Sequence, residues 1–182
     1  GLFVLPESLT KQHRRPFSLV RANPFGALLR LSRGPLFLGL TCVLVCTYLA
    51  EQVLQTIWAL HTQARFNWQP IEIGLSLTLG GIAMGVAQGG LIGPLKARLA
   101  DRGVVILGLV VSVIGFIAFA AASRGWQMYV LLVPFALGGV AAPAAQAILS
   151  GEVSPSEQGE LQGSLTSLQS LASIAGPLLA TT

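Results

Sequence analysis

A polar stripe that contains one carboxyl group lies in the middle of an otherwise apolar stretch of the chain. Thr47, Glu51 and Gln55 recur at every fourth residue, with Gln52 beside them. On an α-helix this spacing drifts by only about 40° per step, so the three side chains share one face. A carboxylate at the centre of a bilayer costs on the order of 2.5–3.5 kcal/mol, so Glu51 must face a cavity, form hydrogen bonds or carry a proton. The stripe predicts either a substrate-binding or proton-coupling carboxyl, or a glutamate that is protonated and structurally hydrogen-bonded or only lines a cavity.

A second apolar stretch carries four glycines at intervals of four residues, and the glutamine Gln88 lies among them. The glycines are Gly81, Gly85, Gly89 and Gly93. Such a face allows another helix to approach closely, and it also lowers helix stability and permits bending. We expect tight helix packing along this face. The amide of Gln88 is expected either to point into a cavity or to cross-link helices.

A proline and a further glutamine occur together in a fourth apolar stretch. Pro143 removes a backbone donor and kinks a helix, which membrane bundles tolerate when a neighbour satisfies the freed carbonyl. Gln146 follows three residues later. Spans that are broken by glycine or proline and surround a cavity at the midplane are typical of transporter sites.

Five long apolar stretches must position these residues, and each is close to the roughly 20 residues that a membrane-spanning helix needs. They cover about residues 35–61, 71–95, 104–122, 126–150 and 161–182. Glu51 is the only charged residue away from the ends of these stretches. Charged residues make up 10% of the chain and apolar residues 53%, far from the balance of a soluble protein. The sequence therefore predicts an all-α membrane protein, a helical bundle in contact with lipid.

The basic residues indicate the orientation of this bundle. Nine of the eleven lysines and arginines lie in residues 1–34 and 96–103, and the other two lie in the alternate loops. By the positive-inside rule, the N-terminal segment and the 96–103 loop are cytoplasmic. Trp58, Trp68 and Trp126 lie near the opposite ends of their stretches, as expected of aromatic residues at a membrane interface. The basic surplus is thus interpreted as an orientation signal, and we expect no nucleic-acid partner.

Residues for catalysis or metal binding are not evident in the sequence. It contains no nucleophile elbow, phosphate-binding loop, zinc motif or separated pair of carboxylates. Cys42 and Cys46 share a helix face, but two thiols without a further cysteine or histidine nearby make a poor metal site. We interpret them as small packing residues. The chain is expected not to be an enzyme and to need no cofactor and no metal.

Short motifs occur in a distinctive order along nearly the whole chain. They are Leu5-Pro-Glu-Ser-Leu, Arg14-Arg-Pro-Phe, Arg65-Phe-Asn-Trp, Gly93-Pro-Leu-Lys-Ala-Arg-Leu, Pro143-Ala-Ala-Gln and Gln158-Gly-Glu-Leu-Gln-Gly-Ser-Leu. None is decisive alone, but in this order and spacing they resemble the tetracycline-resistance type of drug exporter in the major facilitator superfamily.

The resemblance implies the C-terminal half of a twelve-span transporter. Residues 1–34 would be the end of span six and the cytoplasmic central loop, and residues 35–182 would be spans seven to eleven of an incomplete bundle. The chain starts with Gly1 rather than methionine and ends inside an apolar stretch, which also favours a fragment. The loop after span eight is similar to a degenerate Gly-x-x-x-Asp-Arg motif, in which Gly93 and Arg98 match and Ala97 takes the acidic place. Arg98 would then contribute to the contact between halves that opens and closes during transport.

The chain departs from this family at the residues linked to proton coupling. Many tetracycline exporters have a histidine in span eight and an aspartate in span nine, and the matching positions here are Met84 and Ser112. Glu51 lies in span seven, where close tetracycline exporters usually have a small residue. We therefore expect Glu51 to replace the missing acid.

The resulting hypothesis is a proton-coupled antiporter that exports an amphiphilic, tetracycline-like drug across the bacterial inner membrane by alternating access. Its partners would be the drug, protons, lipid and the missing N-terminal half. Gly93, Arg98 and Pro143 would serve the conformational change. The cavity wall is expected to contain Glu51, Gln52, Gln55, Gln88 and Gln146. The alternatives are an exporter of another drug or of an endogenous metabolite, and a membrane scaffold without transport.

Overall fold

Long helices account for nearly all of the computed structural model, which describes residues 26, 28–29, 32 and 34–181. No strand occurs among these described residues. The elements, in chain order, are α2 (Pro35–Phe66), α3 (Pro70–Val86), η2 (Ala87–Leu91), α4 (Ile92–Arg98), α5 (Asp101–Ala121), α6 (Gly125–Ala136), η3 (Leu137–Val140), α7 (Ala141–Glu152) and α8 (Gln158–Thr181). The connector expected over residues 1–34 lies almost entirely outside the described residues and stays a prediction.

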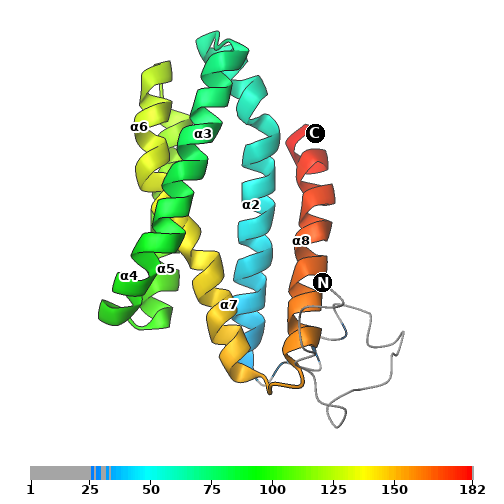
Figure 1. Cartoon of the computed structure of the whole chain (residues 1–182). Helices are drawn as coiled ribbons and strands as arrows, with labels where there is room; N and C mark the ends of the chain where they lie inside the picture. Colours follow the sequence, from blue (N-terminus) through cyan, green and yellow to red (C-terminus); the bar gives the residue numbers. More distant parts are fainter. Residues whose placement is uncertain (1–25, 27, 30–31, 33, 182) are drawn as a thin grey trace, which may run out of the picture.

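The helices run side by side along one direction, as Figure 1 shows. Within the described part of the chain, four helical stretches are long and apolar enough to cross a membrane. They are Pro35–Phe66, Pro70–Arg98, Asp101–Ala121 and Gly125–Glu152. The chain is thus an all-α, multi-pass membrane protein, as the sequence predicted.

The last helix, α8, differs from the other four stretches in its polarity. It carries several serines whose hydroxyls donate to carbonyl oxygens of the preceding turn, so they are satisfied within the helix itself. These serines include Ser164, Ser167 and Ser170. The assignment of α8 as a membrane span stays a prediction.

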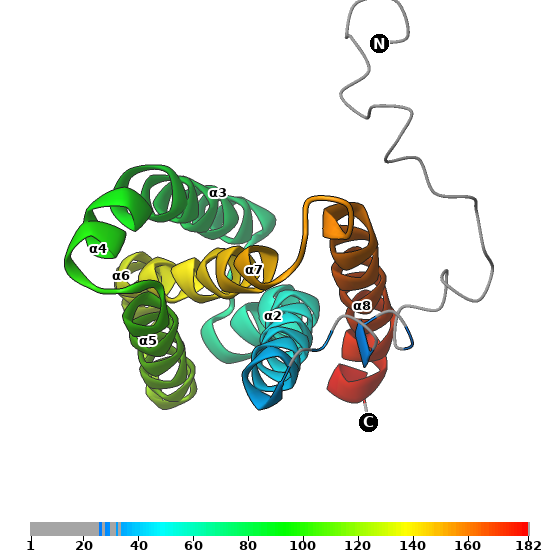
Figure 2. The same ribbon diagram turned by 90° about the horizontal axis from the view of Figure 1, so that it is seen from below.

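Helix α7 lies between α2, α3 and α5 when the bundle is seen along its length (Figure 2). Its side chains there are small, and Ala141, Ala144 and Ala145 are buried. Gly108 of α5 lies so close to α7 that an added Cβ would be 2.8 Å from the Cβ of Ala141. Small residues thus allow α5 and α7 to approach closely. Helix α8 packs mainly on α2, on the far side of the bundle from α3 (Figure 2).

The glycine face of the second stretch does not pack against the described part of this chain. A Cβ added at Gly81, Gly85, Gly89 or Gly93 would meet no heavy atom within 4 Å. The expected tight packing at these positions is therefore absent among the described residues, where close approaches occur instead at other glycines, Gly108 among them. Large apolar side chains such as Ile82 and Val86 are exposed nearby, as expected of a surface in contact with lipid or another membrane helix.

Two segments of the bundle lose regular α-helical geometry. Residues Ala87–Leu91 form a π-helical segment between α3 and α4, and Leu137–Val140 form a 3₁₀ segment between α6 and α7. Each contains two adjacent glycines, which weaken a helix because they lack a side chain. The two segments contact each other. Both long stretches are therefore irregular where they meet.

Candidate functional site

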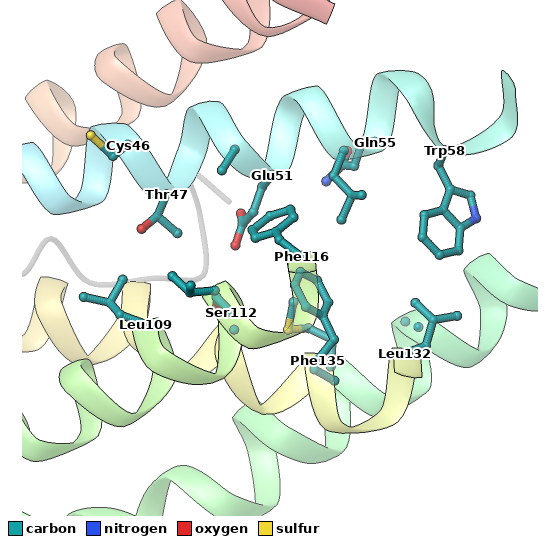
Figure 3. A pocket seen from close by; sticks show the side chains of 18 of the residues that line it. Cys46, Thr47, Glu51, Gln55, Trp58, Leu109, Ser112, Phe116, Leu132 and Phe135 are labelled. Atoms are coloured by element: carbon teal, nitrogen blue, oxygen red, sulfur yellow. The ribbon is translucent and has the colours of Figure 1, made fainter. Parts of the chain in front are cut away.

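A cavity of about 960 Å³ lies between α2, α3, α5 and α6. Figure 3 shows it from close by, with α2 on one side and α5 and α6 on the other. Its wall is mainly apolar and aromatic. The polar, sulfur-containing and aromatic residues that line it include Cys42, Cys46, Thr47, Glu51, Gln55, Trp58, Met84, Ser112, Phe116 and Phe135.

Glu51 lies near the middle of α2, and its carboxyl group points across the cavity toward Ser112 and Phe116 (Figure 3). The side chain is half-buried. No hydrogen bond or ion pair joins the Glu51 carboxyl group to another described residue. Every fully buried side-chain oxygen or nitrogen among the described residues has a hydrogen-bond partner. The Glu51 oxygens, which have none, are therefore not fully buried, and they are open to the cavity. The neighbouring Thr47 hydroxyl donates to the carbonyl oxygen of Val43, 2.9 Å away. Glu51 is thus a carboxyl that is free to bind a proton or a ligand from the cavity.

The structure brings Glu51 and Gln55 together on the cavity wall, but it places the other predicted amides elsewhere. Gln52 packs against Gly176 of α8, on another side of α2. The side-chain amide of Gln146 donates to the hydroxyl of Tyr48 at 2.7 Å and joins α7 to α2. Neither Gln52 nor Gln146 lines this cavity, because each is used in contacts between helices.

Gln88 has a structural role that accounts for the proline in α7. A regular helix would place the N–H of residue 143 on the carbonyl of Gly139, but Pro143 has no N–H. The side-chain amide of Gln88 donates to that carbonyl oxygen at 3.3 Å. Gln88 therefore cross-links η2 to η3 and replaces the missing backbone donor, and it is not among the residues that line the cavity.

Gly93 and Arg98, the residues expected in the cytoplasmic loop motif, both lie in α4. Gly93 is exposed in α4, and Arg98, the last residue of α4, is exposed as well. The turn beside them is held by an ion pair between Lys96 Nζ and Asp101 Oδ1 at 2.9 Å. No ion pair joins Arg98 to a residue in the described part of the chain.

Several cavity residues carried no clear signal in the sequence. Cys42 and Cys46 were interpreted as packing residues, but both are exposed and line the cavity. Met84 and Ser112 also face the cavity. The family that the sequence resembles has a histidine and an aspartate at these two positions. Only this resemblance could have indicated that Met84 and Ser112 line the cavity.

Aromatic rings continue from the cavity toward one end of the bundle. Phe116 and Phe135 meet edge to face with centroids 5.2 Å apart, and Phe119 meets Phe135 at 5.0 Å. Trp58 meets Phe119 at 5.4 Å and donates from its indole nitrogen to Ser76 Oγ at 3.0 Å. The rings pack α2, α5 and α6 together at this end, and the hydrogen bond to Ser76 adds α3.

Further hydrogen bonds tie the same end together beyond the aromatic rings. Arg65 Nε at the end of α2 donates to the carbonyl oxygen of Ala122, 3.1 Å away, at the end of α5. The hydroxyl of Tyr129 in α6 donates to the carbonyl oxygen of Glu72 in α3 at 2.7 Å. We refer to these contacts, together with that between Trp58 and Ser76, as the end clamp.

Comparison with known proteins gives a consistent result. Residues 40–182 match the family model described as Major Facilitator Superfamily. The chain is 38% identical over 182 residues to the class C tetracycline resistance protein of Escherichia coli, covering 100% of the chain and 46% of that protein. It is 42% identical over 160 residues to the class G tetracycline resistance protein of Vibrio anguillarum, covering 87% of the chain and 40% of the relative.

A more distant similarity extends to a mammalian protein. The chain is 24% identical over 183 residues to the hippocampus abundant transcript 1 protein of Mus musculus, covering 98% of the chain and 37% of that protein. The chain thus spans less than half the length of each of these relatives.

Proposed function

Since the chain belongs to the major facilitator superfamily, we propose that it supplies the C-terminal half of a proton-coupled antiporter that exports an amphiphilic, tetracycline-like drug. The exporter would reside in the bacterial inner membrane, with residues 1–34 and 96–103 on the cytoplasmic side. The missing N-terminal half would complete the cavity. Transport would proceed by alternating access, in which the two halves rock around the cavity.

The observation that carries the proposal is the open carboxyl of Glu51. It points into a drug-sized cavity and has no partner among the described residues. Met84 and Ser112, which occupy the places of the coupling histidine and aspartate, line the same cavity and do not titrate near neutral pH. A proton-coupling group in this half is therefore best supplied by Glu51.

Coupling requires only that the Glu51 carboxyl prefers its proton in one orientation and the drug in the other. A ligand can shift an equilibrium between two states by no more than its difference in affinity for them. When the cavity opens to the cytoplasm, the drug would displace the proton. When it opens outward, the drug would leave, and a proton from outside would neutralise the carboxyl before the transporter returns.

The conformational change would use the irregular segments η2 and η3. Their backbones depart from α-helical geometry where the two long stretches meet, Gly139 of η3 lines the cavity, and Gln88 joins the two segments. Pro143 would keep η3 from becoming regular helix. Arg98 at the exposed end of α4 would contact the other half of the transporter in one orientation.

Measurement of drug flux tests this proposal directly. The full-length transporter that contains this chain is expressed, and everted membrane vesicles are energised with a pH gradient. We expect tetracycline uptake that stops when the gradient is collapsed. Uptake of a different compound with the same dependence would indicate another drug or an endogenous metabolite as the substrate. A membrane scaffold would give no flux for any compound and would disprove the proposal.

A further inference from the structure

The wall that this chain contributes to the cavity has a simple charge pattern. Among the described residues that line it, Glu51 is the only acid, and none is a lysine, an arginine or a histidine. The carboxyl group has no hydrogen-bonding or ionic partner among the described residues. Because an unpaired carboxylate is unfavourable in a medium of low dielectric constant, it gains from any cation that reaches it. This wall therefore favours ligands that carry positive charge and disfavours anions.

The surroundings of Glu51 select among cations. The ring of Phe116 points toward the carboxyl group, and Phe135 lies next to Phe116 (Figure 3). The centroids of the two rings are 5.2 Å apart, and their planes are nearly perpendicular. The ring faces of aromatic residues attract organic cations. The thioether of Met84 adds a polarizable apolar surface to the same wall. A cation with aromatic or alkyl groups fits these contacts.

Small hard metal ions suit this wall less well. Mg²⁺ and Ca²⁺ prefer six or more oxygen ligands. Glu51 contributes one carboxylate, and the nearest hydroxyls on the wall are those of Thr47 and Ser112. The Thr47 hydroxyl already donates to the carbonyl oxygen of Val43. An organic cation needs only one counter-charge and an apolar surface, and both are present.

We infer that the substrates of this transporter include lipophilic organic monocations, whose positive centre sits at the Glu51 carboxylate and whose rings contact Phe116 and Phe135. The inference rests on the proposed function and adds a class of substrate defined by its positive charge. The cavity volume of about 960 Å³ accommodates compounds of drug size. A proton and such a cation would compete for the same carboxyl group, so binding of one would exclude the other. No second coupling site in this half would then be needed.

Binding of tetraphenylphosphonium to the purified full-length transporter tests the inference. We expect saturable binding, and we expect triphenylphosphine oxide, a neutral compound of similar shape, to bind at least tenfold more weakly. Glu51→Gln should weaken tetraphenylphosphonium binding at least tenfold, whereas Glu51→Asp should retain most of it. Glu152→Gln is the matched control, because Glu152 is exposed in α7 and away from the cavity. It should leave binding unchanged.

A second variant tests the aromatic contact independently of the carboxyl group. Phe116→Leu keeps the site apolar and removes the ring, and it should weaken tetraphenylphosphonium binding severalfold with little effect on the neutral phosphine oxide. This arm also serves if Glu51→Gln does not assemble in the membrane.

The outcomes separate the inference from the proposed function. If the transporter moves tetracycline but does not bind tetraphenylphosphonium saturably, the inference is wrong and the proposed function stands. Equal tetraphenylphosphonium affinity in Glu51→Gln and the unaltered transporter would also overturn the inference. If no compound is moved in the vesicle assay, the proposed function fails first.

Discussion

Gln88 donates a hydrogen bond to the carbonyl oxygen of Gly139, which Pro143 leaves without its helical donor. The bond joins the π-helical segment of one long stretch to the 3₁₀ segment of another. Two departures from regular helix are therefore joined by this hydrogen bond in addition to their packing. In a membrane this bond matters, because lipid offers no hydrogen-bond donor to a free carbonyl group.

Substitution of Gln88 should lower the stability of the transporter, and substitution of Pro143 by alanine should partly reverse this loss. Gln88→Leu leaves the Gly139 carbonyl unsatisfied, and we expect it to destabilise the transporter by about 1–3 kcal/mol. Pro143→Ala restores a backbone N–H that can reach this carbonyl. The double variant should therefore be more stable than Gln88→Leu alone, as measured by thermal unfolding in detergent. Additive effects in this double-mutant cycle would argue against the relationship.

Removal of the Glu51 charge should uncouple transport from the proton gradient. Glu51→Gln keeps the size of the side chain but cannot exchange a proton. We expect drug uptake driven by a pH gradient in everted vesicles to fall at least tenfold, whereas exchange of labelled for unlabelled drug should be affected less. Glu152→Gln provides the matched control. Unchanged coupling in Glu51→Gln would defeat the assigned role.

A carboxyl group placed on the opposite wall should partly restore coupling. Ser112 of α5 lies across the cavity from Glu51 (Figure 3), and the resemblance places an aspartate at this position. In the double variant Glu51→Gln with Ser112→Asp, we expect gradient-driven uptake to recover severalfold relative to Glu51→Gln. Ser112→Asn, which adds a similar volume without charge, should give no recovery. Equal uptake in the two double variants would show that the charge is not what matters.

The cysteines of α2 should be accessible from the cavity. Cys42 and Cys46 are exposed and line it, so a small maleimide should label the full-length transporter there. On the proposed function the drug binds in the same space, and it should then slow the labelling at least twofold. The double variant Cys42→Ala with Cys46→Ala identifies which labelling arises from these sites. Labelling that is insensitive to a saturating, transported drug would place the drug elsewhere.

The close approach of α5 to α7 should tolerate no side chain at Gly108. An added Cβ would lie 2.8 Å from the Cβ of Ala141, so Gly108→Ala must push the helices apart. We expect a loss of about 1–3 kcal/mol, seen as a lower midpoint of thermal unfolding. Gly74→Ala is the comparison, because a Cβ there would meet no heavy atom within 4 Å. Equal midpoints for the two variants would contradict this account of the packing.

Periodicity in the sequence was enough to predict the all-helical membrane fold and the shared face of Glu51 and Gln55. It was not enough to place the other amides. Gln88 and Gln146 are polar residues within apolar helices, which indicates that each needs a partner. Which partner each finds depends on the rotation and height of the neighbouring helix, and these are set by contacts between residues distant in the sequence.

The glycines illustrate the same limit. Regular spacing identified a smooth face at Gly81 and Gly85, but it did not say whether this chain would cover that face. Close contacts between helices lie instead at other glycines, such as Gly108 and Gly138, which belong to no such regular run. Cys42 and Cys46 were misplaced for a related reason, because small apolar residues suit both a packed interface and a cavity wall.

The end clamp restricts how this half of the transporter can move. Its three hydrogen bonds fasten α2, α3, α5 and α6 to one another at a single pole of the molecule. Helices that are held together at one end separate most readily at the other end. We therefore expect the end of the cavity near Cys42 to widen first when a ligand enters, while the helix ends near Trp58 move together as a rigid body.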